Sequence, residues 1–200
     1  ALTGAFAVAL AAPLLTGALV PNSAQNKLLL TVAGGDLSAV TADVTHSGGQ
    51  VLQSFPVAGA LLVMMPTGIP VPSGSFAIPD QQMTFNGTMT EVSSAPVNAY
   101  RSSIRTPAGL TGAGVTVALV DTGVADTGEV DVEHLNVSGA PTGDGLGHGI
   151  FLSGLVAGDG SGSDGAYQGV APDAKVLDVQ VADQKGRTSL SQVLAGLQAV

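Results

Sequence analysis

The sequence predicts an α/β fold, with a mostly parallel sheet flanked by helices, preceded by a small α+β domain. Two observations support this prediction. From residue 101 onward, apolar strand-like runs alternate with helical segments, a pattern typical of a parallel sheet with helices on its faces. Between residues 27 and 67, shorter runs follow the order β-α-β-β. We therefore expect two structural units in this chain.

The composition indicates a globular protein. The chain has 200 residues, of which 45% are hydrophobic and 10% are charged, which is enough apolar material for a buried core. A net charge of −9 disfavours nucleic acid as a partner and stable association with an anionic membrane. The absence of cysteine excludes thiol catalysis, disulfides and zinc sites built from cysteine.

Residues 1–26 carry no charge, and the first 20 are almost all apolar or small. We interpret this segment as a signal peptide or apolar leader, because Asn22-Ser23-Ala24 offers small residues suited to cleavage. A membrane-spanning helix is the alternative, since about 20 apolar residues can cross a bilayer. Because neither an initiator Met nor a basic segment precedes it, we expect the chain to start inside a longer gene product. The leader predicts a secreted, extracellular protein.

Residues 27–67 are predicted to form the small domain. Its expected helix presents Leu37, Val40 and Val44 on one face, with Asp36 as the N-cap. Three apolar runs bounded by turn residues are predicted to be its strands. These runs are Leu28–Val32, Gln50–Phe55 and Ala58–Met65.

Residues 68–100 contain four of the eleven prolines and many Ser, Thr and Gly residues, so we predict a linker and processing region. Residues 101–200 then show the α/β pattern. The last predicted helix begins near Leu190 with a capping box formed by Ser189 and Gln192. The other predicted elements of this unit are strands Val115–Val120 and Lys175–Val181 and a helix His148–Ala157.

Two residues of this unit are candidates for catalysis. Asp121 ends a predicted strand, and functional groups of parallel sheets gather at the carboxyl ends of strands. His148 lies between two glycines at the start of a predicted helix, where its ring could face a cleft. An imidazole that bonds a carboxylate through one nitrogen can act as a general base through the other. Alternatively, Asp121 caps a turn and His148 is a neutral helix-terminus residue.

The flanks of both residues closely resemble the first two catalytic blocks of subtilisin-like serine peptidases. These flanks are Leu110–Gly123 and Asp144–Gly149, and the segment Gly169–Val176 resembles a third family block. The resemblance implies a subtilisin-like sheet, here incomplete, in which Asp121 orients His148 and His148 accepts the proton of a serine. Polypeptides are the implied substrates. The family's serine block and its oxyanion-hole Asn would lie beyond Val200, so we expect this fragment alone to be inactive.

Residues 27–67 resemble, more weakly, the inhibitory propeptide of the same family. This resemblance implies that the small domain is an intramolecular inhibitor of a secreted serine endopeptidase precursor. One departure supports an alternative, a catalytically inactive subtilase-like binding scaffold. Ile150 stands where the family usually has Thr after the Gly-His-Gly block.

Other residues are assigned no catalytic role. His46 and His134 are predicted to be surface or cap residues, and Ser153 is five residues from His148 on the same helix, so it points elsewhere. The proposed chemistry requires no cofactor. The loop Asp159–Gly165 departs from the EF-hand pattern, which needs Gly at its sixth position and Glu at its twelfth. Structural calcium is implied only by the resemblance, because many subtilases bind it.

Overall fold

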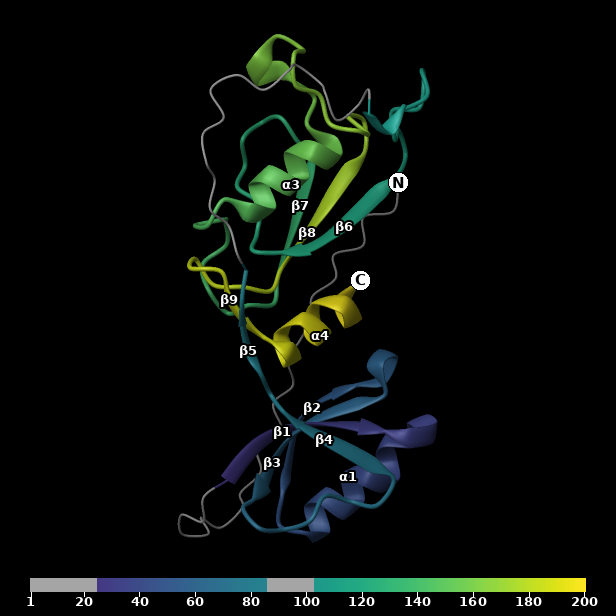
Figure 1. Ribbon diagram of the computed structural model, residues 1–200, viewed down its shortest axis with the longest axis vertical. Helices are drawn as coiled ribbons and strands as arrows, with labels where there is room; N and C mark the ends of the chain where they lie inside the picture. Colours follow the sequence, from purple (N-terminus) through teal and green to yellow (C-terminus); the bar gives the residue numbers. More distant parts are fainter. Residues whose placement is uncertain (1–24, 86–102) are drawn as a thin grey trace, which may run out of the picture.

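The computed structural model describes residues 25–85 and 103–200 and contains two units (Figure 1). A small domain comes first, and an α/β unit follows it, with helix α4 (Leu190–Ala199) lying between the two. Almost all of the predicted leader, and residues 86–100 of the predicted linker, lie outside the described residues. No helix in the described ranges is long and apolar enough to span a bilayer.

The small domain is an antiparallel sheet in the order β2-β3-β1-β4, with one helix. Its elements are β1 (Gln25–Val32), α1 (Leu37–His46), β2 (Gln50–Phe55), β3 (Ala60–Pro66) and β4 (Ser75–Pro79), with short 3-10 turns at Ala33–Gly35 and Pro56–Ala58. The predicted β-α-β-β order is confirmed. Asp36 caps α1 as expected, because its side chain accepts hydrogen bonds from the backbone N–H groups of Ser38 and Ala39.

Two predicted boundaries of the small domain are wrong. The strand β1 begins at Gln25, so the last two residues assigned to the leader belong to the sheet. Residues 75–79, assigned to the linker, form β4 and pair with β1. The prolines obscured this strand, but Pro79 lies at its end and β4 is at the edge of the sheet, where a missing N–H is tolerated.

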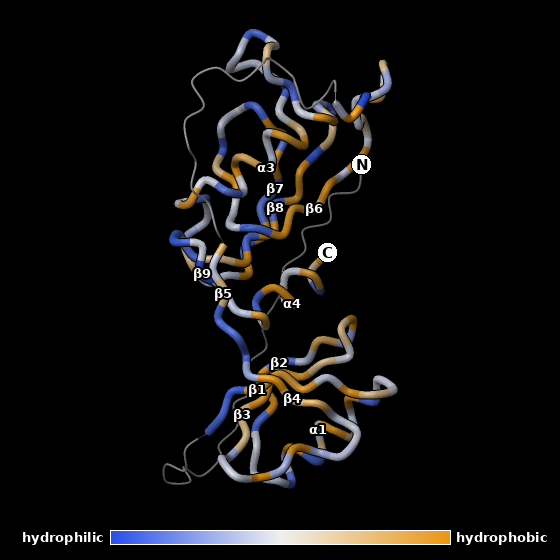
Figure 2. The backbone as a smooth tube through the Cα atoms, in the orientation of Figure 1, coloured by the Kyte–Doolittle hydropathy of each residue, from blue (hydrophilic) through white to orange (hydrophobic). Residues whose placement is uncertain are grey.

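The two faces of the small-domain sheet pack against different helices. One face buries Val40 and Val44 of α1. The other face packs against α4, and this contact buries apolar side chains of both units. The residues in this second contact are Leu29, Phe55, Ala60, Leu62 and Ile78 of the small domain and Leu190, Leu194 and Ala195 of α4. Hydrophobic residues accordingly concentrate along the strands of the small domain (Figure 2).

The α/β unit is built on a parallel sheet in the order β6-β8-β7. Its elements are β6 (Thr116–Asp121), β7 (Val132–Asn136), α3 (His148–Ala157), a 3-10 turn at Ser161–Ser163, β8 (Lys175–Gln180), β9 (Arg187–Ser189) and α4. The strand β9 pairs antiparallel with β5 (Gln82–Thr84), which follows the small domain. The mostly parallel α/β fold is therefore confirmed for the described residues, and α3 begins and ends at the predicted residues.

The strand β7 was missed because its sequence, Val-Glu-His-Leu-Asn, does not form an apolar run. It lies at the edge of the parallel sheet and pairs only with β8 among the described strands, so polar side chains are tolerated there. The strands β5 and β9 were also missed. Each has only three residues, and their pairing joins segments more than 100 residues apart in the chain.

The N-terminus of α4 is capped partly by the segment that follows β4. Ser189 and Gln192 form the predicted capping box. The first two helical N–H groups bond across the junction, from Leu190 to the Gln81 carbonyl at 3.0 Å and from Ser191 to Asp80 Oδ1 at 2.9 Å. Unsatisfied N–H groups at a helix start favour carboxylate partners. This end of α4 therefore depends on both units.

Candidate active site

The first candidate residue, Asp121, occupies the carboxyl end of β6. It is 4% exposed and lies beside Gln180, its partner in the β6–β8 register. Its Oδ1 atom accepts a hydrogen bond from the backbone N–H of Thr122 at 2.7 Å. The carboxylate is thus fixed by the turn that leaves the strand.

The second candidate, His148, is the first residue of α3, and Gly147 precedes it with φ 87°, a left-handed conformation that glycine adopts without strain. The imidazole Nδ1 lies 2.7 Å from Asp121 Oδ1. Because a carboxylate can only accept, this contact favours the proton on Nδ1 and leaves Nε2 as the basic nitrogen. The expectation that the two side chains meet is confirmed. The side chain of His148 is 28% exposed, whereas that of Asp121 is 5% exposed.

A third carboxylate, Asp144, organises the loop before His148. Its Oδ1 accepts from the N–H groups of Leu146 and Gly147, and its Oδ2 accepts from the N–H of Ile150 at 2.9 Å. These are the N–H groups around the start of α3, where a carboxylate is favoured. The sequence interpretation gave Asp144 no role, although it begins the block that contains His148.

The turn after β6 packs closely against the start of α3. The backbone N–H of Gly149 donates to Thr122 Oγ1 at 3.0 Å, and this hydroxyl lies 2.9 Å from Asp144 Oδ1. A Cβ atom on Gly149 would overlap the carbonyl oxygen of Gly123. Position 149 therefore requires glycine. The close approach of Gly149 to Gly123 fixes the separation of Asp121 and His148.

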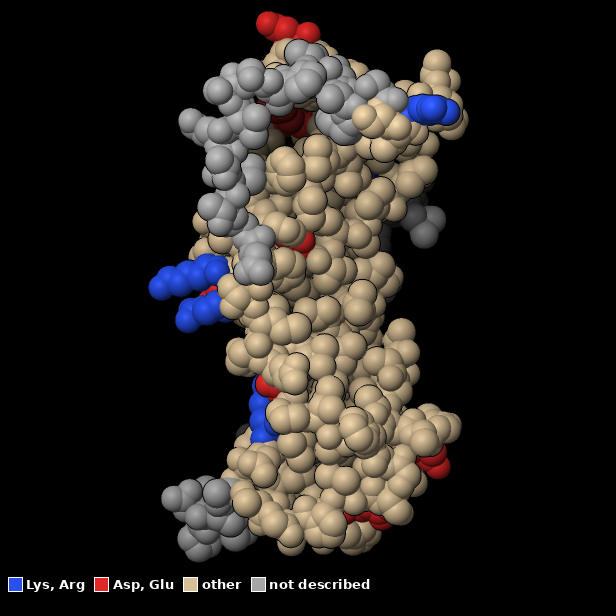
Figure 3. Space-filling model, in the orientation of Figure 1, with Lys and Arg blue, Asp and Glu red and all other residues tan. Residues whose placement is uncertain are grey.

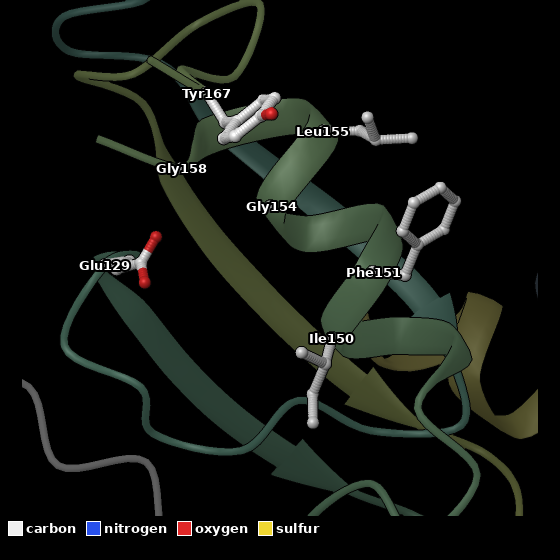
Figure 4. Close-up of a pocket in the computed structure, with 7 residues that line it drawn as sticks. All are labelled: Glu129, Ile150, Phe151, Gly154, Leu155, Gly158 and Tyr167. Carbon is white, nitrogen blue, oxygen red and sulfur yellow. The ribbon is translucent and has the colours of Figure 1, made fainter. Parts of the chain in front are cut away.

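The departure at Ile150 does not disturb this geometry. The side chain of Ile150 lines an open pocket of about 330 Å³ that Glu129 and Tyr167 also line (Figure 4). Neither Asp121 nor His148 lines this pocket. Ser153 lies on the same helix and is 1% exposed, and its hydroxyl donates a hydrogen bond to the Ile150 carbonyl oxygen.

A segment of the chain itself reaches the candidate site. The strand β5 runs along β9, and the residue after it, Phe85, donates its N–H to the Gly186 carbonyl at 2.8 Å. The ring of Phe85 lies 5.5 Å from the imidazole of His148, at an interplanar angle of 52°. An extended peptide on this edge therefore brings a side chain onto the candidate base.

The two remaining histidines differ. His46 ends α1 and is exposed, as predicted. His134 is more than a surface residue, because its Nδ1 lies 2.9 Å from Oδ2 of the completely buried Asp178. That carboxylate sits inside an apolar strand run, so spacing along the sequence gave no sign of the pair. In the described ranges, no group of three or more His, Asp or Glu side chains is arranged to hold a metal ion. On the face shown in Figure 3, Lys and Arg side chains are few and scattered.

A profile of the subtilase family matches residues 112–200. This match covers the parallel sheet, α3, α4 and both candidate residues. Residues 112–200 belong to the subtilase family. The chain also has a stretch similar to the serine protease AprX of Bacillus subtilis (strain 168), with 36% identity over 55 residues, which are 28% of this chain and 12% of AprX.

Solved subtilase-like structures share the fold. Fervidolysin from Fervidobacterium pennivorans, a keratinolytic enzyme related to subtilisin, has 19% identity and a TM-score of 0.56 over 88% of this chain and 34% of its own. The epidermin leader peptide processing serine protease EpiP from Staphylococcus aureus has 18% identity and a TM-score of 0.60, over 88% of this chain and 48% of its own. This chain therefore spans less than half the length of each relative.

Proposed function

We propose that this chain is the N-terminal part of a secreted serine endopeptidase precursor, which hydrolyses peptide bonds through an Asp-His-Ser triad. Asp121 and His148 are the acid and the base, and the serine comes from sequence beyond Val200. The 2.7 Å contact between Asp121 Oδ1 and His148 Nδ1 carries the proposal. It leaves Nε2 as the basic nitrogen, which is the arrangement that serine activation requires.

In the proposed reaction, His148 Nε2 takes the proton of the serine hydroxyl while the serine oxygen attacks the peptide carbonyl carbon. The imidazolium that forms is stabilised by the Asp121 carboxylate, which stays ionised. His148 then gives this proton to the leaving amine, and the C–N bond breaks. Water repeats the sequence on the acyl-enzyme. The reaction needs no cofactor, because side chains carry out each proton transfer.

The proposed substrates are polypeptides that bind in an extended form. The edge of β9 supports this, because it pairs with β5 as an antiparallel strand, and main-chain pairing of this kind accepts many sequences. The position of Phe85 adds a side-chain preference, since its ring packs on His148. Peptides with an aromatic residue at the equivalent position are therefore expected to bind best.

We also propose that the small domain inhibits the enzyme within the same molecule. The strand β5 takes the edge of β9 that a substrate would use, and Phe85 covers part of the imidazole. The sheet contact with α4 and the capping of α4 by Asp80 and Gln81 support a stable docked arrangement. Removal of the small domain would then release the site. Secretion rests on the uncharged leader predicted for residues 1–26.

An activated serine can be detected without knowing the substrate. A fluorophosphonate probe reacts covalently with such a serine. The protein to test is the longer gene product, which contains these residues and the sequence after Val200. We expect labelling once the small domain is removed, and a loss of about 10⁴-fold or more in the His148→Ala variant. The Asp126→Asn variant, changed at an 82% exposed side chain of the α/β unit, should label normally. Equal labelling of the His148→Ala variant would contradict the proposal.

A further inference from the structure

A second carboxylate–imidazole pair lies beneath the turn that carries Asp121. Asp178 is in the central strand β8, and His134 is its direct neighbour in the β7–β8 register. Asp178 is 0% exposed. Its Oδ2 atom accepts two hydrogen bonds, one from His134 Nδ1 at 2.9 Å and one from the backbone N–H of Val124 at 3.0 Å. No described residue bonds the other oxygen, Oδ1.

A fully buried carboxyl group with an unpaired oxygen either takes up a proton or stays ionised beside a compensating cation. Burial raises the pKa of Asp178, while the bonds from His134 and Val124 oppose the rise and the charge of Asp144 adds to it. The bond to Asp178 in turn raises the pKa of His134, with burial opposing it and Asp126 adding to the rise. Each member of the pair thus influences the charge of the other.

The bond to Val124 connects this pair to the candidate active site. Val124 is 2% exposed and follows Gly123, whose carbonyl oxygen contacts Gly149 of α3. The Asp178 bond therefore holds the far end of the turn that begins at Asp121. Thr122, inside the same turn, bonds the Gly149 N–H. A shift of Val124 would be passed to both candidate residues through these contacts.

We propose that Asp178 is a positioning residue for the Asp121–His148 pair, and that His134 keeps the Asp178 carboxylate ionised so that it holds Val124. Neither residue touches substrate. The functional part of this inference rests on the proposed peptidase activity, whereas the positioning itself is a property of the fold.

The positioning can be measured without catalysis. The chain has three histidines, so their imidazole resonances can be assigned in nitrogen-15 NMR spectra of the 200-residue protein. The readout is the His148 Nδ1 proton, which is shifted strongly downfield while it is bonded to Asp121. We expect the His134→Gln and Asp178→Asn variants to weaken or broaden this signal at neutral pH.

The matched control is Asp126→Asn. Asp126 contacts the other nitrogen of His134 at 3.2 Å, but its side chain is 82% exposed, so this variant should leave the His148 signal unchanged. His134 is on an edge strand and its side chain is 26% exposed. The His134→Gln variant should therefore retain the fold even if the Asp178→Asn variant does not. An unchanged His148 proton signal in folded His134→Gln would overturn the proposal.

In the active enzyme, we expect His134→Gln to lower kcat about fivefold at neutral pH with KM unchanged, as for residues coupled to a site without contacting it. Without the His134 cation, Asp178 takes up a proton at higher pH, so the acidic limb of the rate profile should move to higher pH. A purely structural defect would lower activity equally at every pH, which would also overturn the proposal. If Asp121→Asn left turnover intact while the His148 signal still responded to His134→Gln, the peptidase proposal alone would fail.

Discussion

The ring of Phe85 packs against the imidazole of His148, with centroids 5.5 Å apart and planes inclined by 52°. Phe85 comes from the segment after the small domain, and His148 begins a helix of the α/β unit. The backbone N–H of Phe85 donates a hydrogen bond to the carbonyl oxygen of Gly186, which is next to β9. The residue that we assign as the general base is therefore partly covered by the chain's own extended segment.

Replacing Phe85 with Ala should weaken this self-inhibition. An aromatic contact contributes about 0.5–1.5 kcal/mol beyond its buried area, so the uncleaved precursor should hydrolyse a small fluorogenic peptide roughly tenfold faster. The control is Phe76→Ala, an aromatic residue of β4 that is 68% exposed. If both variants behaved like the wild type, Phe85 would have no part in the inhibition.

Asp121→Asn should abolish most of the activity. Asn offers both an N–H and a carbonyl oxygen to Nδ1, so it no longer enforces the productive tautomer and cannot stabilise an imidazolium. In a triad peptidase of another fold, the same change lowers kcat about 10⁴-fold, and we expect a similar loss with little change in KM. Steady-state kinetics on a chromogenic peptide would measure it. Asp126→Asn, an exposed carboxylate five residues away, should keep full kcat.

Protonation of Asp80 should weaken the docking of the small domain in acid. Burial alone would raise its pKa, but the hydrogen bonds from Lys27 and Ser191 outweigh burial and hold the pKa below its ordinary value of 3.8. A depressed pKa means that the stabilisation is complete above the unfolded-state pKa and is lost as pH falls through the folded-state value. Asp80→Asn should therefore cost about 1–2 kcal/mol at neutral pH and much less once the pH falls below the lowered pKa of Asp80.

Urea unfolding of both proteins across this pH range would measure that difference. Asp43→Asn, on the exposed side of α1, provides the comparison, because it removes a charge from the same domain without touching α4. If the free energy of unfolding of Asp80→Asn differed from that of the wild type by the same amount at all pH values, the stabilising role of the ionised Asp80 would be contradicted.

The elements that local sequence signals determine were predicted well. The helix α3 follows its glycines and apolar run, α4 follows its capping box, and Asp121 lies at a strand end as the apolar run before it indicates. The meeting of Asp121 with His148 was also predicted, but only through the resemblance to subtilases. From the residues alone, each had an ordinary structural alternative.

The features that sequence reasoning missed are those defined by distant partners. The strand β9 becomes a strand because β5 lies beside it, and β7 is an edge strand whose polar residues hide its pairing. The bond between His134 and Asp178 joins two strands separated by 44 positions in the chain. No local pattern marks such contacts, because tertiary structure alone creates them.

Two glycines of α3 should respond in opposite ways to the same substitution. A Cβ on Gly149 would overlap the carbonyl oxygen of Gly123, which is backbone and cannot rotate away. Gly149→Ala must therefore push α3 from the turn that carries Asp121, at a cost of at least about 2 kcal/mol. In contrast, a Cβ on Gly154 meets no atom within 4 Å. Gly154→Ala should stabilise the protein by up to about 1 kcal/mol, because alanine favours the helix.

The activities of these two variants separate a positioning effect from a general one. The displacement in Gly149→Ala lengthens the bond from His148 to Asp121, so kcat should fall steeply even at temperatures where the protein remains folded. Gly154→Ala changes the same helix by the same methyl group and should keep its kcat. Thermal unfolding and peptide hydrolysis, measured on both, provide the comparison. Equal stability of the two variants would show that α3 can move away from Gly123 without cost. The close approach of Gly149 to Gly123 would then not set the distance between Asp121 and His148.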